Sequence, residues 1–349
     1  MNRQRMLWWA GAGLASWLAY RIYRSSTAYS FAGKTVFITG GTRGLGLVMA
    51  RQLAREGANL AVCARDPEEV RRAHEELSRY GVRVVAQTCD LRYRDHVRTF
   101  LDEARRQLGA IDVLINNAGI ISVGPVETMT LEDFHDAMAS NYFAAVHTIL
   151  EVLPEMQQRQ QGRILNITSI GGKISVPHLL PYSASKFALV GLSEGLRAEL
   201  AKDGIVVTTV CPFLMRTGSP RNASFKGQHR AEYAWFALSD SIPGIAMDAE
   251  RAARKILNAC RYGDAEVVLS LPGKLAALAH GIAPGLVSDI NGWVNRLLPR
   301  PGGIGMHSAL GWESESKIVP SWLTTLTERA ARANNEMGLP SSASAEPRP

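Results

Sequence analysis

The chain has 349 residues, of which 46% are hydrophobic and 20% charged, and its formal net charge is +7. This composition is typical of a globular protein able to bury a large core. No basic run is interleaved with aromatic residues, so the charge favours a solvated surface attracted to anionic lipid over a nucleic-acid-binding protein. Cys63, Cys89, Cys211 and Cys260 form no Cys-x-x-Cys pair, which predicts buried thiols and neither a metal site nor a disulfide framework.

An uncharged segment, residues 6–20, lies near the N-terminus between pairs of arginines. As a helix it would extend about 22 Å, against about 30 Å for the hydrocarbon core of a bilayer, and its tryptophans and tyrosines suit a membrane interface. We therefore expect residues 1–28 to be a membrane anchor, spanning or interfacial, with the catalytic domain facing the cytoplasm. A cleaved signal peptide and a buried helix are the alternatives.

A short β-branched strand is predicted at residues 34–39, and a glycine-rich turn at residues 40–46 follows it at once. A helix with apolar Leu47, Val48 and Leu53 comes next and stops at Gly57. Strand, glycine turn and helix in this order place backbone N–H groups and a helix N-terminus where they can receive a phosphate. The order predicts a dinucleotide-binding turn.

The end of the second predicted strand, residues 59–64, indicates the type of dinucleotide. An acidic residue at this place usually holds the ribose 2′-hydroxyl of NAD. Here the strand ends at Ala64 and is followed by Arg65, and Arg43 in the glycine turn is a second nearby cation. A cation without a carboxylate favours the 2′-phosphate of NADP(H), and two ordinary surface arginines are the alternative.

Predicted helices and strands continue to alternate. Seven such units predict an α/β fold with a doubly wound, seven-stranded parallel sheet, whose ligand crevice lies at the carboxyl ends of the strands. The glycine turn, the Asn-Asn-Ala-Gly run at residues 116–119 and Ser169 all follow strands, so we expect them to meet there. Helices are expected at residues 67–80, 92–108, 131–158, 183–200 and 249–260, and strands at residues 82–87, 111–115, 163–168, 205–210 and 266–270.

Tyr182 and Lys186 are four residues apart on a predicted helix, so their side chains share one face. A phenol has a pKa of about 10, and a neighbouring ammonium group favours the phenolate and lowers that pKa. Such a phenol can exchange a proton with a carbonyl or alcohol oxygen, which the hydroxyl of Ser169 can hold by a hydrogen bond. Alone, Tyr-x-x-x-Lys is also common on helix surfaces, so its meaning depends on the other motifs.

Over residues 34–270, the sequence resembles the short-chain dehydrogenase/reductase family. The resemblance rests on Thr-Gly-x-x-x-Gly-x-Gly at residues 39–46, Asn-Asn-Ala-Gly at residues 116–119, and Ser169 placed thirteen residues before Tyr-x-x-x-Lys. It implies a Rossmann-like fold and the catalytic residues Asn141, Ser169, Tyr182 and Lys186. Implied cofactor-binding positions are Gly40, Thr42, Arg43, Gly44, Leu45, Gly46, Arg65, Asp90, Leu91, Asn117, Ala118, Gly119, Tyr182, Lys186 and Thr217.

The same resemblance implies a role for each catalytic residue. Tyr182 would be the acid/base, and Lys186 would lower the pKa of Tyr182 and bind the nicotinamide ribose. Ser169 would position the substrate oxygen, and Asn141 would complete a water-linked proton relay through Lys186. Asp90 matches the residue that contacts the adenine.

The family pattern changes after the sixth predicted strand, where Pro-Gly is usual and this chain has Pro212-Phe213. Phe213 is expected beside the nicotinamide, where it would narrow the pocket or alter the loop, while Thr217 keeps the place of a carboxamide-binding threonine. Residues 216–247 match the variable substrate loop of the family. Their aromatic side chains either cover an apolar substrate or pack the loop onto the core.

Beyond residue 270 the resemblance fades. Residues 273–299 are apolar at near-helical spacing with a break at Pro284, and they would lie on a membrane, close a dimer or pack on the catalytic domain. Residues 301–320 are loop-like, and a helix is expected at 322–334. The domain organisation is an anchor and linker at 1–28, a catalytic domain at 29–271, a helical extension at 272–335 and a disordered tail at 336–349.

These features predict a membrane-associated, NADP(H)-dependent oxidoreductase without a metal. Its substrate would be a small apolar carbonyl compound or alcohol, lipid-like and of ketoacyl, steroid or retinoid type. A homodimer or tetramer is compatible with the sequence, and no nucleic-acid partner is expected. The alternatives are a non-catalytic NADP-binding scaffold or redox sensor at a membrane, and a lipid-binding module.

Overall fold

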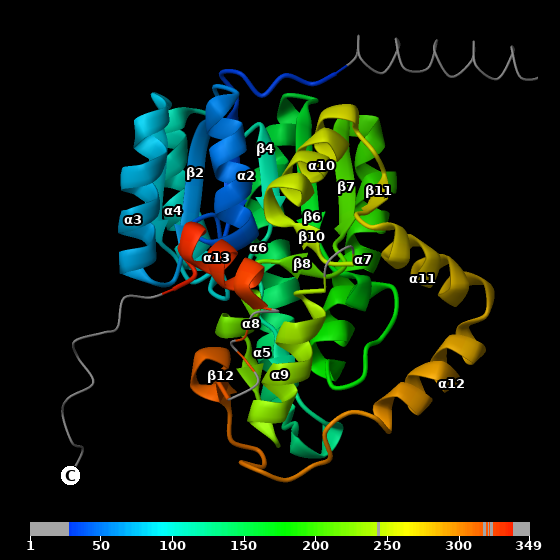
Figure 1. Ribbon diagram of the computed structural model, residues 1–349. Coiled ribbons are helices and arrows are strands. Elements are labelled where there is room, and N and C mark those ends of the chain that lie inside the picture. The colour runs from blue at the N-terminus through cyan, green and yellow to red at the C-terminus, as the bar shows by residue number, and fades with distance from the viewer. Residues whose placement is uncertain (1–27, 243–244, 317–318, 320, 322–323, 338–349) are drawn as a thin grey trace, which may run out of the picture.

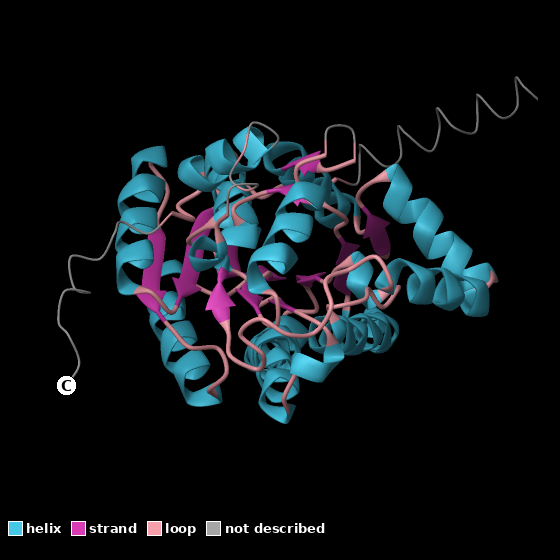
Figure 2. Cartoon of the chain, turned by 60° about the horizontal axis from the view of Figure 1, so that its bottom comes forward, coloured by secondary structure: helices cyan, strands magenta, loops and turns pink. Residues whose placement is uncertain are grey.

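A seven-stranded parallel sheet forms the centre of the computed structural model, which describes residues 28–242, 245–316, 319, 321 and 324–337. Helices cover both faces of the sheet (Figure 1; Figure 2). The strand order β11-β7-β6-β4-β1-β2-β3 confirms the predicted doubly wound α/β fold. The strands are β1 (Thr35–Thr39), β2 (Asn59–Ala64), β3 (Val84–Thr88), β4 (Val113–Asn116), β6 (Gly162–Ile167), β7 (Ile205–Cys211) and β11 (Glu266–Val268).

Strand β1 shows how the sheet builds two cores. All its residues are buried, and Val36 and Ile38 belong to the core of one face while Phe37 belongs to the other. Successive side chains of a strand alternate between faces, so a strand covered on both sides is apolar throughout. Helices α2 (Gly44–Arg55), α3 (Pro67–Leu77) and α10 (Ala249–Tyr262) cover the first face, and α4 (Arg94–Leu108), α6 (Ala144–Gln158) and α7 (Leu180–Leu200) cover the second.

The order of the strands reverses at β1, with β2 and β3 on one side and β4, β6, β7 and β11 on the other. In such sheets a ligand crevice opens at the carboxyl ends of the strands beside the reversal. Asn117 joins the two strand ends that meet there. Its N–H donates to Thr39 Oγ1 at 2.9 Å and its amide donates to the carbonyl of Gly40 at 3.1 Å.

The predicted helix at residues 131–158 is interrupted. The chain forms α5 (Leu131–Met138), one π-helical turn at Ala139–Phe143, and then α6. The turn contains Asn141, whose side-chain amide donates to the carbonyl of Ile120 at 3.1 Å and whose Oδ1 accepts the N–H of Ile120 at 2.7 Å. These bonds fix the chain just after the Asn-Asn-Ala-Gly run, and π turns of this kind are frequent at functional sites.

The variable region after β7 folds over the carboxyl ends of the strands. His178 Nδ1 lies 2.9 Å from Glu232 Oε1, and Trp235 Nε1 donates to Glu232 Oε2 at 2.7 Å, so this buried pair holds α9 against the loop before α7. The elements of the region are β8 (Met215–Arg216), α8 (Ser219–Asn222), β9 (Ser224–Phe225), α9 (His229–Ser239) and β10 (Met247–Asp248).

The C-terminal part has two different halves. Helices α11 (Leu271–Ile282) and α12 (Pro284–Asn295) break at the predicted proline and extend away from the sheet (Figure 1; Figure 2). Helix α13 (Thr325–Ala333) returns to the body beside α2. The interval predicted as loop contains β12 (Ala309–Leu310), which pairs antiparallel with β9, which in turn pairs with β5 (Ser122–Val123) in a small second sheet.

The predicted membrane anchor falls in residues 1–27, outside the described residues, as does most of the predicted tail. Within the described ranges, no helix has the length and apolar character needed to cross a bilayer.

Candidate active site

The glycine turn brings the backbone of β1 against the first turn of α2. Gly40 and Gly44 have φ values of +61° and +53°, in the left-handed region that favours glycine. Gly46 lies so close to the carbonyl oxygen of Gly40 that a Cβ there would be 2.1 Å from it. Arg43, the residue before α2, makes no side-chain capping hydrogen bond to the helix N-terminus. The turn therefore leaves the amino end of α2 facing the crevice, as the sequence predicts.

A cavity of about 620 Å³ opens between the glycine turn, the strand ends and the N-terminal half of α7. Every predicted site residue except Asn141 and Gly46 lines it. Those residues are Gly40, Thr42, Arg43, Gly44, Leu45, Arg65, Asp90, Leu91, Asn117, Ala118, Gly119, Ser169, Tyr182, Lys186 and Thr217.

Asn141 stands behind the cavity wall. A Cβ on Gly119, which lines the cavity, would lie 2.7 Å from Asn141 Oδ1, and the amide of Asn141 also donates to Ser185 Oγ at 2.9 Å. The side chain of Asn141 is thus hydrogen-bonded to Ile120 and to α7, and it supports the cavity wall from behind.

Tyr182 is half-buried in the cavity wall and shares a hydrogen bond with Ser169. Burial raises the pKa of Tyr182 to about 12; the bond to Ser169 lowers it and the charge of Asp240 raises it. This direction is the opposite of the one expected from the sequence, because a neutral phenol is favoured where water is excluded. The raised pKa keeps the proton on Tyr182 at neutral pH.

Lys186 does not form an ion pair with the phenol in this pocket. Its Nζ donates to the carbonyl of Ile167 at 3.0 Å and lies 5.7 Å from the centre of the Tyr182 ring. Burial lowers the pKa of Lys186 to about 8. Burial disfavours charge on both groups, so Tyr182 keeps its proton at neutral pH, whereas Lys186, with a pKa of about 8, remains mostly protonated there.

Two arginines lie at the other end of the cavity. Arg43 Nη1 pairs with Glu69 at 2.7 Å, whereas Arg65 is exposed and forms no ion pair within the described ranges. Asp66 accepts the N–H groups of Glu68 and Glu69, so its carboxylate caps α3. Arg65 is therefore the unpaired cation at the end of β2, where the sequence predicts one.

Asp90 lies at the same end of the cavity as the two arginines. Its carboxylate pairs with Arg92 at 2.6 Å, and the hydrogen bonds from Arg92 hold the pKa of Asp90 below its usual range. Both residues line the cavity at the end of β3.

The residues at this end fit a nicotinamide dinucleotide. Thr42 is fully buried in the glycine turn, and its Oγ1 has no hydrogen-bond partner among the residues that the structure describes. Buried hydroxyl groups are nearly always paired, so this one calls for a ligand group. Together with the glycine turn and the amino end of α2, it forms a site for phosphate oxygens.

Two buried acids in the cavity wall were not predicted. Asp240 follows α9 and lies near Tyr182, and burial raises its pKa to about 8. Glu336 falls in the tail that the sequence predicts to be disordered, and for this residue the prediction is wrong: Glu336 is buried, lines the cavity, and has a pKa raised to about 7 by burial. No local pattern marks either acid, because both reach the cavity through tertiary contacts.

The aromatic residues of the variable region do line the cavity. Phe213, Trp235 and Phe236 form its wall beyond Tyr182, together with Val176 and Leu179. Phe225 and Tyr233 instead pack in a core below. The loop therefore packs onto the core through Phe225, Tyr233 and Phe236, and it lines the cavity through Trp235 and Phe236.

The short chain dehydrogenase family matches residues 34–226 of the chain. The ketoacyl reductase HetN of Nostoc sp. is 35% identical over 190 residues, covering 54% of this chain and 66% of HetN. Dehydrogenase/reductase SDR family member 7B of Bos taurus is 32% identical over 280 residues, covering 78% of this chain and 82% of that protein. The solved actinorhodin polyketide ketoreductase with NADPH has a TM-score of 0.60 and 30% identity, covering 69% of this chain and 97% of that one.

Proposed function

The chain belongs to the short-chain dehydrogenase/reductase family of oxidoreductases, and from that premise we propose that it interconverts a carbonyl group and a secondary alcohol with NADP(H). The observation that carries the proposal is one cavity that holds the Ser169–Tyr182 hydrogen bond, Lys186 and a glycine turn with an unpaired buried hydroxyl. We place Asn141, Ser169, Tyr182 and Lys186 in the catalytic machinery.

In reduction, the bound dinucleotide supplies the hydride that reaches the carbonyl carbon. Ser169 and Tyr182 hold the carbonyl oxygen between their hydroxyl groups, and Tyr182 donates its proton as negative charge develops there. The raised pKa keeps this proton in place until that moment. Lys186, 5.7 Å from the ring, stabilises the phenolate that remains and takes part in its reprotonation. Asn141 holds the wall at Ile120.

The preference for NADP(H) is supported by the cations at the end of β2. Arg65 is unpaired within the described ranges, and Arg43 is paired with Glu69 in the glycine turn. A 2′-phosphate would meet both guanidinium groups, whereas the 2′-hydroxyl of NAD would find no free carboxylate at this strand end, since Asp66 caps α3. The structural relative quoted above was solved with NADPH.

The substrate that fits the far end of the cavity is apolar and lipid-like. Phe213, Trp235 and Phe236 line this end, and the only acid among the described residues there, Asp240, is held neutral below about pH 8 by burial. Ketoacyl, steroid and retinoid carbonyls have the required combination of one polar oxygen and a large apolar surface. The name of the relative HetN is that of a ketoacyl reductase.

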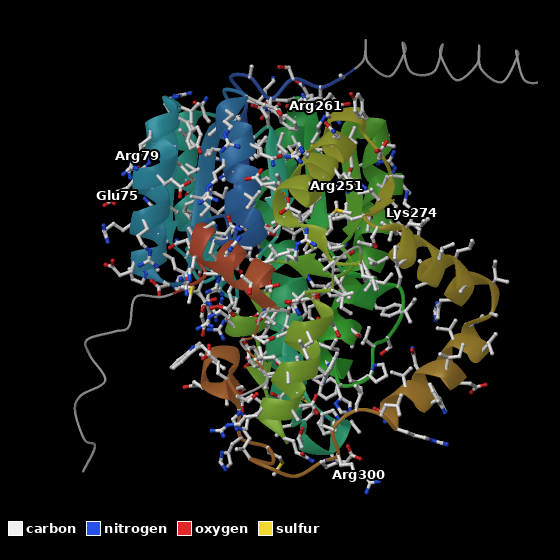
Figure 3. All side chains as sticks on the ribbon, viewed as in Figure 1. Glu75, Arg79, Arg251, Arg261, Lys274 and Arg300 are labelled. Atoms are coloured by element: carbon white, nitrogen blue, oxygen red, sulfur yellow. The ribbon has the colours of Figure 1, made fainter. Side chains whose placement is uncertain are left out.

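The helical hairpin α11–α12 supports a membrane source for that substrate. Seven large apolar side chains on it, and Leu297 just beyond its end, are 50% to 75% exposed, and α12 has no buried residue. Lys274 and Arg300 stand near its two ends (Figure 3), and Asp289 is its single acid. The exposed apolar residues are Leu271, Leu275, Leu278, Ile282, Leu286, Ile290, Trp293 and Leu297.

The hairpin also lies next to the cavity. The amide of Asn291 donates to the carbonyl of Ser175 at 3.0 Å, beside Val176 in the cavity wall. Gly273 lies against Phe213, with only 3.2 Å from an added Cβ to the Cβ of Phe213. An apolar surface flanked by cations suits the interface of an anionic bilayer, so the occupant that we assign to the hairpin is a lipid surface.

A fluorophore at residue 286 tests this assignment. The four native cysteines are buried, so Leu286→Cys can be labelled with an environment-sensitive dye in the full chain. With vesicles of anionic lipid, its emission should shift to the blue, while Leu131→Cys, a similarly exposed position on α5, should not shift. Equal emission shifts at both positions, or no shift at residue 286, would contradict the proposal that the hairpin binds a lipid surface.

Turnover tests the activity itself. The full chain is given NADPH or NADH with ketoacyl thioesters, steroid ketones, retinal and small polar carbonyls, and the alcohol products are identified. We expect faster oxidation of NADPH with the apolar compounds. Equal turnover of small polar carbonyls would contradict the lipid-like substrate, and tight dinucleotide binding without any product would favour the non-catalytic scaffold.

A further inference from the structure

The residues that follow α13 form a clamp over the glycine turn. The carbonyl of Asn334 accepts the N–H of Gly44 at 2.8 Å, and the amide of Asn335 donates to the carbonyl of Thr42 at 2.9 Å. Asn334 Oδ1 also accepts Arg51 Nη1 of α2 at 2.7 Å, and Asn335 Oδ1 accepts Arg72 of α3 at 2.6 Å. The clamp, residues 334–336, is therefore bonded to the turn and to both helices beside it.

Glu336 inserts its carboxyl group between two backbone segments of the cavity wall. Its Oε2 accepts the N–H of Gly218 at 2.6 Å, and its Oε1 would lie 2.9 Å from a Cβ on Gly44, the first residue of α2. The amide of Asn222 donates to its main-chain carbonyl at 3.2 Å. A carboxyl group thus stands at the amino end of a helix, at a place that suits an anion.

Resting on the proposed function, we propose that Glu336 is a component of the cofactor site that makes dinucleotide binding proton-linked. The phosphate groups and this carboxyl group share the N-terminus of α2, and two anions in one buried place repel each other strongly. The carboxyl group therefore accepts a proton from solvent when the dinucleotide binds. Protonated, it remains in place and can donate a hydrogen bond to a phosphate oxygen.

The charged groups around Glu336 agree with this linkage. The positive charge of Arg43 in the glycine turn favours the ionised form of Glu336, and the negative charge of Glu69 on α3 opposes it; these two residues also form an ion pair. Two further arginines are engaged by other acids. Arg51 pairs with Glu76, and Arg221 of α8 pairs with Glu315 and Glu328. Arg43 is thus the cation that acts on the carboxyl group, and it is already paired with Glu69, while Arg72 of α3 beside the clamp is bonded to Asn335. Burial raises the pKa of Glu336 to about 7 in the free protein, so added phosphate charge raises it further.

The linkage has a definite sign. Below pH 7 the carboxyl group of Glu336 is already protonated, so dinucleotide binding needs no proton uptake. Above pH 7 binding requires the uptake of a proton, so the affinity for the dinucleotide falls as the pH rises. If the pKa in the complex lies well above 8, the Kd of NADPH should rise about tenfold between pH 6 and pH 8 through this group.

The experiment compares NADPH binding by the full chain and by Glu336→Gln at pH 6, 7 and 8. Glu336→Gln keeps the shape of the side chain and an oxygen that can accept the N–H of Gly218. Its Kd for NADPH at pH 8 should be about tenfold lower than that of the wild-type protein, and at pH 6 the Kd values of the two proteins should agree. Glu328→Gln on α13, which removes a partner of Arg221, is the matched control and should follow the wild-type protein. Equal pH dependence in all three proteins would overturn the proposal.

A measurement on the wild-type protein guards against misfolding of the variant. Calorimetric titration with NADH, which has no 2′-phosphate, in buffers of different ionisation enthalpy at pH 7.5 should show net proton uptake on binding. Proton release or no exchange would contradict the role of Glu336. If neither dinucleotide binds at any pH, the proposed function itself fails, which is a separate result.

Discussion

The two ends of the cavity are built in different ways. The cofactor end consists of strand termini, a glycine turn and the first turn of a helix, so backbone geometry gives it its shape. The substrate end consists of side chains from α9, from the loop after β7 and from the segment before α7. The first end can be inferred from short sequence motifs. The second depends on how distant segments pack, and its specificity follows from that packing.

The largest expected effect separates chemistry from binding. Tyr182→Phe removes the proton donor and leaves the ring, so kcat should fall at least about a hundredfold while the Kd of NADPH stays within about twofold. Steady-state rates and a binding titration provide the two numbers. Tyr80→Phe, at a half-buried tyrosine beside Arg55 and outside the cavity lining, is the control and should change neither. If the Tyr182→Phe protein retained a tenth or more of the wild-type kcat, the assignment of Tyr182 as the proton donor would be contradicted.

The next effect alters the cofactor end alone. Arg65→Glu places a negative charge where the 2′-phosphate is expected, so kcat/KM with NADPH should fall about tenfold or more, with little change for NADH. The ratio of the two kcat/KM values is the measurement. Arg79→Glu, at an exposed arginine just after α3 (Figure 3), should leave the ratio unchanged. A ratio unmoved by Arg65→Glu would contradict the preference for NADP(H).

The third effect concerns the substrate end and is measured as stability. The folded-state pKa of Asp240 is raised to about 8, so the folded protein binds a proton that the unfolded chain releases near pH 4. Its stabilising contribution is therefore full below pH 4 and declines until pH passes 8, by up to about 1.4 kcal/mol per pH unit.

Asp240→Asn should remove this decline and unfold at higher urea than the wild-type protein at pH 8. Glu132→Gln, at an exposed acid on α5, serves as control and should keep the wild-type slope. Urea midpoints at pH 5.5, 6.5, 7.5 and 8.5 provide the comparison. Parallel slopes for the wild type and Asp240→Asn would show that the carboxyl group ionises freely in the folded state.

The parts of the molecule that the sequence predicts are those fixed by local rules. The inner strands β1, β2, β4, β6 and β7 are buried along most of their length, as expected for strands covered on both faces. Gly40, Gly44 and Gly46 have conformations or contacts that other residues would not tolerate. The spacing of Tyr182 and Lys186 places both in one cavity.

The parts that were missed depend on contacts between distant residues. The sequence around Asn141 has a continuous helical pattern, but the structure forms a π turn there. The side-chain amide of Asn141 bonds to the carbonyl of Ile120, a contact that the pattern does not reveal. The pKa of Tyr182 is set by burial, which the neighbouring lysine does not reveal. Glu336 lies in a polar segment with no apolar periodicity and is ordered only by its bonds to Gly218 and its neighbours' bonds to the glycine turn.

The most direct test of the proposed activity follows the hydride itself. The full chain is given an apolar ketone and NADPH carrying deuterium in both positions at C4 of the nicotinamide, and the alcohol is analysed by mass spectrometry. We predict one deuterium on the carbinol carbon of each product molecule, with the label lost when Tyr182→Phe abolishes turnover. Alcohol formed without deuterium, or dinucleotide bound with no alcohol from any carbonyl tested, would contradict the assignment of the cavity as a hydride-transfer site.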